Sequence, residues 1–260
     1  MAGLAGVLVV GIVVLANVAG GSAPGPGPFV FFALLAPALA VLGLWQHRRR
    51  QAALRAWAAG TGWSYSAVEP GLEDRWRGQP FGQGSRRRGT EVLRGTFESM
   101  PALSFTYQWT TGSGKSTENH RAHVVAVALP AYLPTVELTP DGLGAKLAKL
   151  VGAQDIRFES EAFNAAWRVT GSDPRVAHDI VHPRLMERLL RADARGSSLR
   201  VEGTWVLSWE QGATSVDRIA PRLGLLTAVA RAVPRHVWLD HGHDPLSLGS
   251  PGPTPPGGPS

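Results

Sequence analysis

The stretch TTGSGKSTEN at residues 110–119 has the residue types of a loop that binds nucleotide phosphates. Such a loop needs a glycine, four residues and then Gly-Lys-Ser/Thr, and it must leave a strand and open a helix so that backbone N–H groups face the phosphates. Trp109 occupies the leading glycine position, and the residues after Asn119 have the pattern of a strand. The stretch therefore predicts the loop of a β-hairpin, and nucleotide binding by residues 112–117 is the alternative.

Four histidines are the candidates for a metal site. His178 and His182 stand four residues apart, a spacing at which two imidazoles on one helix can share a zinc ion, and the HGH cluster supplies His241 and His243. However, His182 precedes Pro183, and the residue before a proline is disfavoured in helical geometry. Because a metal site needs three or four convergent ligands, surface or capping roles are favoured and no metal or cofactor is expected. A metal-dependent hydrolase using these histidines is the alternative function.

Two other clusters carry charge. Glu159 and Glu161 stand two residues apart, and paired carboxylates can do acid–base work, but no partner side chain with a role accompanies them. Arg86, Arg87 and Arg88 predict a solvated basic loop, with binding to an acidic partner or a membrane surface left open. No catalytic residue is assigned, and a binding, scaffold or regulatory module is favoured over an enzyme.

Two apolar runs at the N-terminus predict a membrane anchor. Residues 1–45 contain no Asp, Glu, Lys or Arg, and residues 3–20 and 29–45 are each close to one bilayer thickness in length as helices. Between them, residues 21–28 are dense in Pro and Gly and predict a turn. A cleaved signal peptide would need a positively charged start, which is missing here. A transmembrane helical hairpin is therefore predicted, and a single span after a signal-like segment is the alternative.

The arginines after the second apolar run predict its orientation. Arg48, Arg49, Arg50 and Arg55 lie in the zone that governs topology, whereas the connecting turn is uncharged. The positive-inside rule then places both termini and the folded domain in the cytoplasm of a multi-pass plasma-membrane protein. The topology signal alone accounts for these arginines, although they can also contact anionic lipid headgroups. Residues 46–62 are expected to form a basic juxtamembrane helix.

Composition narrows the classes of partner. The net charge is +6 and there is no cysteine, which excludes disulfides, thiolate metal sites and cysteine nucleophiles. The basic balance suits an anionic surface such as the inner face of a membrane. No nucleic-acid-binding module is recognisable, so the expected partners are the lipid bilayer and a protein of unknown identity.

Hydrophobic patterns predict an α+β domain over residues 63–244. Apolar and polar residues alternate over 103–110, 163–170 and 201–210, as in half-buried strands, whereas residues 123–129 are apolar on both faces, as in a central strand. Weaker strand signals occupy residues 63–68, 91–98, 135–139 and 155–159. Four tryptophans of these patterns are expected in the core: Trp109, Trp167, Trp205 and Trp209.

Three helices are predicted among these strands. The first is capped by Thr139, the second is capped by Asp173 and broken by Pro183, and the third spans residues 216–233. Neighbouring runs of strands with helices at intervals indicate a mostly antiparallel sheet with packed helices. Residues 245–260 are too rich in Pro, Gly and Ser to fold and are expected to be a disordered tail.

Four stretches resemble a group of uncharacterised membrane-anchored proteins of actinobacteria. They lie at residues 57–84, 155–169, 181–190 and 234–245, so the likeness covers about residues 57–245. The resemblance implies the same plan of apolar N-terminal segments, a basic juncture and one compact domain. It implies no activity and brings no catalytic residues.

Overall fold

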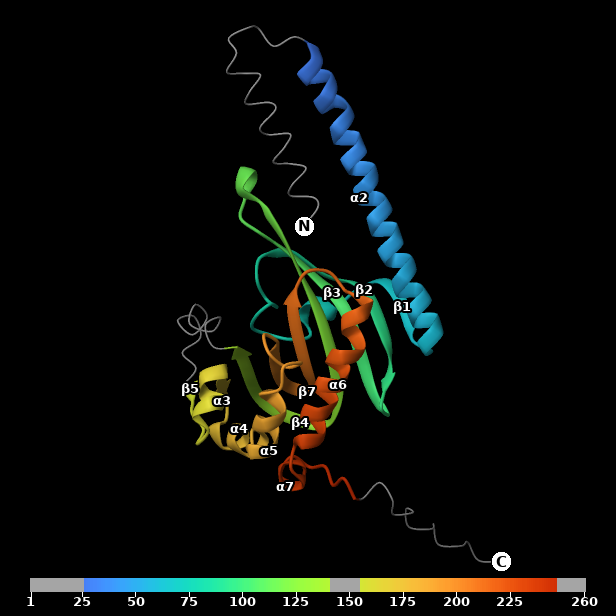
Figure 1. Ribbon diagram of the computed structural model, residues 1–260. Coiled ribbons are helices and arrows are strands. Elements are labelled where there is room, and N and C mark those ends of the chain that lie inside the picture. Colours follow the sequence, from blue (N-terminus) through green and yellow to red (C-terminus); the bar gives the residue numbers. More distant parts are fainter. Residues whose placement is uncertain (1–25, 141–154, 247–260) are drawn as a thin grey trace, which may run out of the picture. The chain divides into compact units, whose positions relative to one another are not determined.

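The computed structural model of the chain describes residues 26–140 and 155–246 (Figure 1). The chain divides into two compact units, Met1–Ala53 and Leu54–Ser260. The predicted span over residues 3–20, the predicted tail beyond residue 246 and most of the helix predicted after Thr139 lie outside the described residues.

Helix α2, Pro26–Thr61, combines the second apolar run and the predicted juxtamembrane helix in one element. It ends where Gly62 adopts a positive φ of 72° and the Trp63 N–H donates to the Ala58 carbonyl over 2.8 Å, a helix-ending motif that favours glycine. Within the part of the chain that the structure describes, no helix has both the length and the apolar content needed to cross a membrane. The hairpin of two spans stays a prediction.

Seven strands form one antiparallel sheet. They are β1 Ser64–Glu69, β2 Ser85–Phe97, β3 Met100–Thr111, β4 Glu118–Pro140, β5 Asp155–Ile156, β6 Trp167–Gly171 and β7 Ser198–Gln211. The order is β1-β2-β3-β4-β6-β5, and β7 pairs with β4 in addition. Every pairing is antiparallel, which confirms the predicted α+β class. Strand β4 has neighbours on both sides, as its apolar faces over residues 123–129 predicted.

The helices of the second unit are short except for one. They are α3 Glu161–Ala166, α4 Pro174–Ile180, α5 Pro183–Leu189, α6 Val216–Ala232 and α7 Arg235–Asp240, with 3₁₀ turns η1 Leu72–Asp74 and η2 Gly114–Ser116. Asp173 caps α4 as predicted, because its Oδ1 accepts from Arg175 N at 2.9 Å and from Val176 N at 3.3 Å. The break at Pro183 and the long helix after residue 215 are confirmed as well.

Three local predictions were wrong. The strand predicted over residues 163–170 starts only at Trp167, because Ser160 Oγ accepts from Phe163 N at 3.2 Å and caps a helical turn, α3. Thr139 caps no helix, since it pairs with Arg168 at the end of β4. The arginines at residues 86–88 lie in β2 rather than in a loop, because the hairpin with β3 extends far enough to include them.

Each face of the sheet is covered by a separate core. On one face, α6 lies across β3, β4 and β7 (Figure 1), and its Ile219, Leu223 and Leu226 are fully buried there. The other face is covered by the segment between β1 and β2, residues 70–84. Its apolar side chains pack with strand residues in the second core, which contains Leu72, Trp76, Phe81, Phe105, Tyr107 and Leu207. Of the four predicted core tryptophans, Trp167 is buried in the first core, and Trp109, Trp205 and Trp209 are partly buried beside the second.

A buried ionic group, here called the Arg200 cluster, ties segment 70–84 to the sheet. The Arg200 side chain is 1% exposed, and its guanidinium lies 2.6 Å from Glu137 Oε2 and 3.6 Å from Glu202 Oε2. The same guanidinium donates to the backbone carbonyls of Arg77 and Gln79, the latter at 2.7 Å. One side chain of β7 therefore neutralises carboxylates of two strands and satisfies two carbonyls of the covering segment.

We expect substitutions of two glycines to have opposite effects on stability. A Cβ added at Gly95 in β2 would lie 2.5 Å from the Trp63 ring, whereas one added at Gly60 in α2 would meet nothing within 4 Å. Gly95→Ala should therefore lower the free energy of unfolding by about 1–3 kcal/mol through overpacking. Gly60→Ala should raise it by up to about 1 kcal/mol because alanine loses less backbone entropy in a helix. Guanidinium unfolding of the full chain in mild detergent measures both, and equal effects would contradict this packing.

Candidate functional site

The glycine-rich stretch at residues 110–119 forms the turn of the β3–β4 hairpin. Thr110 pairs with Asn119 in the ladder, and the Thr110 hydroxyl donates to Asn119 Oδ1 at 3.0 Å. Gly112 has a positive φ of 78°, and a Cβ there would lie 2.0 Å from the Ser116 carbonyl oxygen, so the turn itself requires this glycine. The stretch is followed by β4 and not by a helix, so it lacks the strand–loop–helix geometry of a phosphate-binding loop. The predicted hairpin is confirmed.

Two of the four candidate metal ligands have structural contacts. His178 lies in α4, where its ring centroid is 4.8 Å from that of Phe158. His182 is the N-cap residue of α5, and its Nε2 hydrogen-bonds the carbonyl of Ala232 at 2.8 Å, at the C-terminal end of α6. His178 therefore packs on an aromatic ring, and His182 hydrogen-bonds a carbonyl at the end of a helix.

The other two histidines lie beyond α7. His241 follows that helix, and the His243 ring stands edge-on to Trp238 at a centroid distance of 6.1 Å. Helices α4 and α7 do approach each other, and His236 Nε2 lies 3.6 Å from Asp179 Oδ1 between them. Across residues 26–140 and 155–246, however, no three His, Asp or Glu side chains converge in a way that could hold a metal ion.

Glu161 and three of the arginines singled out in the sequence make single local contacts. Glu161 occupies the first turn of α3, where a negative charge suits the helix dipole. Arg49 lies over the Trp45 ring at 5.3 Å, and Arg55 lies over the Tyr65 ring at 5.1 Å. In β2, Arg87 pairs with Asp74 at 3.2 Å. These contacts are those of solvated cations near aromatic rings or single carboxylates.

A buried polar group, here called the His123 cluster, lies beneath α6 and was not predicted from the sequence. His123 Nε2 is 2.9 Å from Ser104 Oγ, and its Nδ1 is 3.7 Å from Glu210 Oε1. Ser104, His123 and Glu210 therefore follow the order of a hydroxyl, an imidazole and a carboxylate that activates serine nucleophiles in hydrolases. The distance from Nδ1 to Glu210 Oε1 is too long for a hydrogen bond, and Nδ1 has no hydrogen-bond partner among the described residues.

The surroundings of the His123 cluster argue against catalysis. Ser104 and His123 are both 0% exposed, so no substrate carbonyl could reach the hydroxyl in this conformation. Glu210 is engaged by Arg222 at 2.5 Å and by Arg218, both from α6. The cluster thus joins three strands to the covering helix and acts as a structural polar network.

Two pKa values in the His123 cluster are shifted downward, one by burial and the other by neighbouring charged and hydrogen-bonding groups. Burial lowers the pKa of His123 below its usual value, and the nearby Arg222 charge acts in the same direction. Burial alone would raise the pKa of Glu210, but His123 and the cations Arg222 and Arg218 outweigh it, and the pKa lies below its usual range. We therefore assign a neutral imidazole beside an ionised carboxylate near neutral pH.

We expect this neutral imidazole to make the fold sensitive to mild acid. The unfolded chain takes up a proton on His123 at a higher pH than the folded chain, so the stabilisation is complete above about pH 6.5 and is lost as the pH falls. The midpoint of thermal unfolding should therefore fall between pH 7 and pH 5.5, and His123→Gln should reduce that slope. Identical slopes for the two proteins would show that His123 does not set the acid response.

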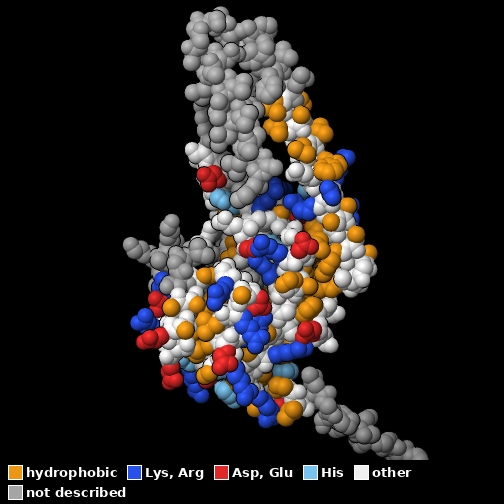
Figure 2. Space-filling model, viewed as in Figure 1, with side chains coloured by type: hydrophobic (Ala, Val, Ile, Leu, Met, Phe, Trp, Pro, Cys, Tyr) orange, Lys and Arg blue, Asp and Glu red, His pale blue; other side chains and the backbone are white. Residues whose placement is uncertain are grey.

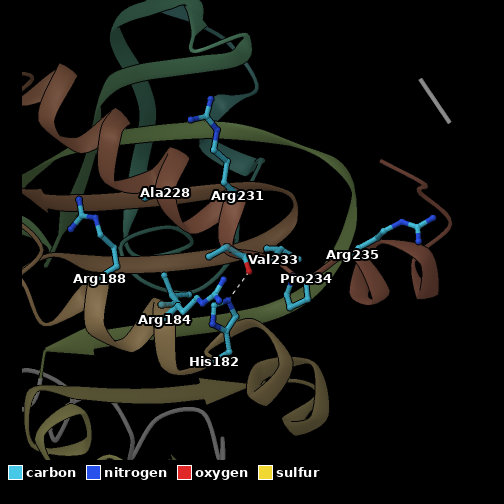
Figure 3. Close-up of a pocket in the computed structure, with 10 residues that line it drawn as sticks. His182, Arg184, Arg188, Ala228, Arg231, Val233, Pro234 and Arg235 are labelled. Atoms are coloured by element: carbon cyan, nitrogen blue, oxygen red, sulfur yellow. Dashed lines mark hydrogen bonds between the residues drawn. The ribbon is translucent and has the colours of Figure 1, made fainter. Parts of the chain in front are cut away.

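A surface pocket of about 580 Å³ lies between α5, the C-terminal end of α6 and the start of α7. Its lining includes five basic side chains, namely His182, Arg184, Arg188, Arg231 and Arg235 (Figure 3). The remaining lining residues are apolar and include Leu185, Val233 and Pro234. Sequence reasoning missed this pocket because its residues come from three separate segments with no motif spacing.

Comparisons with known proteins relate the chain to one solved structure. No protein-family model matches the sequence, and no similar sequence is found among curated proteins. The fold is similar to that of the mycobacterial trehalose monomycolate transport factor A, TtfA, with a TM-score of 0.50 and 15% sequence identity. The similarity covers 72% of this chain and 95% of the chain of that protein. At this identity the similarity establishes a shared fold.

Proposed function

We propose that this chain is a membrane-anchored accessory factor in the transport of an amphiphilic glycolipid, acting by binding rather than by catalysis. The observation that carries the proposal is the fold shared with trehalose monomycolate transport factor A over 95% of that chain. Because one fold can host many functions, the distribution of apolar and basic side chains serves as independent support.

Exposed apolar side chains are concentrated in one part of α2. Leu39, Val41, Leu42, Leu44 and Trp45 have exposed fractions between 47% and 65%. Figure 2 shows hydrophobic side chains along this helix, followed by basic ones. Such a density of exposed large apolar residues is typical of contact with lipid or with another protein. We infer that this part of the chain enters the membrane and that the arginines at residues 48–50 stay at its cytoplasmic surface.

The proposed arrangement has both apolar runs in the bilayer and the α+β unit in the cytoplasm. The chain lacks cysteine, so single cysteines can report which side each segment faces. We expect an impermeant maleimide added to intact cells to label Ser22→Cys, in the turn between the runs, and to leave Ser116→Cys, in the β3–β4 hairpin, unlabelled. Both variants should label after the membrane is permeabilised. Labelling of Ser116→Cys in intact cells would instead place the α+β unit outside.

Deleting the gene for this protein in its native host tests the transport role. Lipids labelled with radioactive acetate would be separated into inner-membrane and surface fractions and resolved by thin-layer chromatography. We expect loss of the protein to retain an acylated-sugar lipid in the inner membrane and to deplete it at the surface. The full chain should restore the distribution, whereas a chain without residues 1–45 should not. An unchanged lipid distribution after loss of the protein would overturn the proposed role.

A further inference from the structure

The pocket between α5, α6 and α7 has no part in the function proposed above, yet its lining is unusual in charge. Ten residues line it, of which four are arginines, one is histidine and none is acidic. The volume of about 580 Å³ falls in the range of small-molecule sites. Figure 2 shows acidic and basic side chains interspersed over the visible face of the second unit, so a lining with one sign of charge is a local feature.

The carboxylates near these arginines lie outside the pocket lining. The ion pairs are Arg188 with Asp193 at 2.7 Å, Arg231 with Glu98 at 2.6 Å and Arg235 with Asp244 at 3.1 Å. The fourth arginine, Arg184, is exposed and forms no ion pair with any residue of the described ranges. In Figure 3 the Arg184 side chain extends beside His182, whereas Arg235 points away. Arg184 is therefore the cation whose charge is available in the pocket.

The C-terminal end of α6, which carries partial negative charge, borders the pocket, and a hydrogen bond from His182 partly neutralises that charge. Carbonyls at the C-terminus of a helix carry partial negative charge and lack partners within the helix. His182 Nε2 donates to the Ala232 carbonyl at 2.8 Å, a bond drawn in Figure 3, and so satisfies one of these acceptors. This contact reduces the helix-end charge that would otherwise oppose an anion in the pocket.

We propose that this pocket binds the phosphate-bearing headgroup of an anionic membrane lipid, with Arg184 as the principal contact. An arginine guanidinium presents paired N–H donors that match two phosphate oxygens. The apolar half of the lining, including Leu185, Val233 and Pro234, suits the glycerol and first acyl carbons of such a lipid better than it suits a free phosphate ion. The inference concerns this pocket alone and does not depend on the transport role.

The test uses the full chain in nanodiscs made of phosphatidylcholine. Dihexanoyl-phosphatidylglycerol, a soluble anionic lipid, is titrated by calorimetry, with dihexanoyl-phosphatidylcholine and inorganic phosphate as separate ligands. We expect the anionic lipid to bind and Arg184→Gln to weaken that binding by about tenfold or more. The matched control is Arg121→Gln, which removes an exposed arginine of β4 outside the pocket and should leave the affinity unchanged.

A label inside the pocket separates site binding from partition into the nanodisc. Ala228 lines the pocket and is half-buried, and the chain has no other thiol. A trifluoromethyl group attached to Ala228→Cys should shift its fluorine resonance with the anionic lipid and not with phosphatidylcholine. Equal affinity for inorganic phosphate, with the same loss in Arg184→Gln, would assign the site to soluble phosphoryl compounds and overturn the lipid assignment.

Two further outcomes would overturn the headgroup site altogether. One is equal binding of both lipids, which would indicate apolar partition, and the other is equal weakening by Arg184→Gln and Arg121→Gln. Failure of this site leaves the lipid-distribution experiment in cells unaffected, so the two proposals can fail separately.

Discussion

Replacing Arg200 with alanine should lower the free energy of unfolding by about 3–5 kcal/mol, the cost of leaving buried charges without a partner. The Arg200 side chain is 1% exposed, and Glu137 and Glu202 beside it are 23% and 19% exposed. Truncation leaves two carboxylates without their cation and two backbone carbonyls of residues 77 and 79 without a donor. Guanidinium unfolding of the full chain in mild detergent, followed by near-ultraviolet circular dichroism, measures the loss of tertiary packing.

A matched surface pair shows whether burial is the cause of that loss. Arg87 pairs with Asp74 at 3.2 Å, but the Asp74 side chain is 71% exposed. Arg87→Ala should therefore cost about 0–1 kcal/mol. In the Arg200 cluster, Arg200→Met combined with Glu137→Gln should recover part of the stability lost in Arg200→Ala, because no carboxylate at Glu137 is then left unpaired. Similar losses for Arg200→Ala and Arg87→Ala would contradict a special role of the buried cluster.

The elements that the sequence predicted well are those whose signal is local. Strict alternation over residues 103–110 and 201–210 lies in β3 and β7, and the Asp173-Pro174 pair marks the start of α4. The predictions failed where a short pattern fits two structures. The alternation over residues 163–170 begins as one helical turn, α3, and the Thr139-Pro140 pair ends a strand instead of starting a helix.

The His123 cluster, the Arg200 cluster and the arginine-lined pocket were harder to predict, because their residues meet only in the folded chain. His123 stands in an apolar run that indicates a central strand, and nothing local marks Ser104 or Glu210 as its neighbours. Arg200 and Glu137 are separated by 63 positions in the sequence. The pocket arginines come from α5, α6 and α7, so the packing of these helices brings them together. Among the histidines, which do have local spacing, His178 and His243 contact aromatic rings, and His182 hydrogen-bonds a helix-end carbonyl.

Replacing Trp76 with alanine should lower the free energy of unfolding by about 3–5 kcal/mol, as much as Arg200→Ala. Here the cause is lost packing and not an unpaired buried charge. Trp76 is 3% exposed and stacks on Phe105 at a centroid distance of 5.9 Å, with Phe81 at 5.3 Å and Trp205 at 6.0 Å. It is the central ring by which segment 70–84 covers the sheet. Trp76→Phe keeps an aromatic ring there and should lose less stability than Trp76→Ala.

Trp76 and Arg200 hold the same segment to the sheet, one by packing and one by hydrogen bonds to the carbonyls of residues 77 and 79. Once one contact is lost, the segment is already loosened, so the second substitution has less left to disrupt. We therefore expect the Trp76→Ala, Arg200→Ala double variant to lose less stability than the sum of the single losses, by about 0.5–3 kcal/mol. Additive losses would mean that the two contacts stabilise the cover independently, and segment 70–84 would then not be a single cooperative unit.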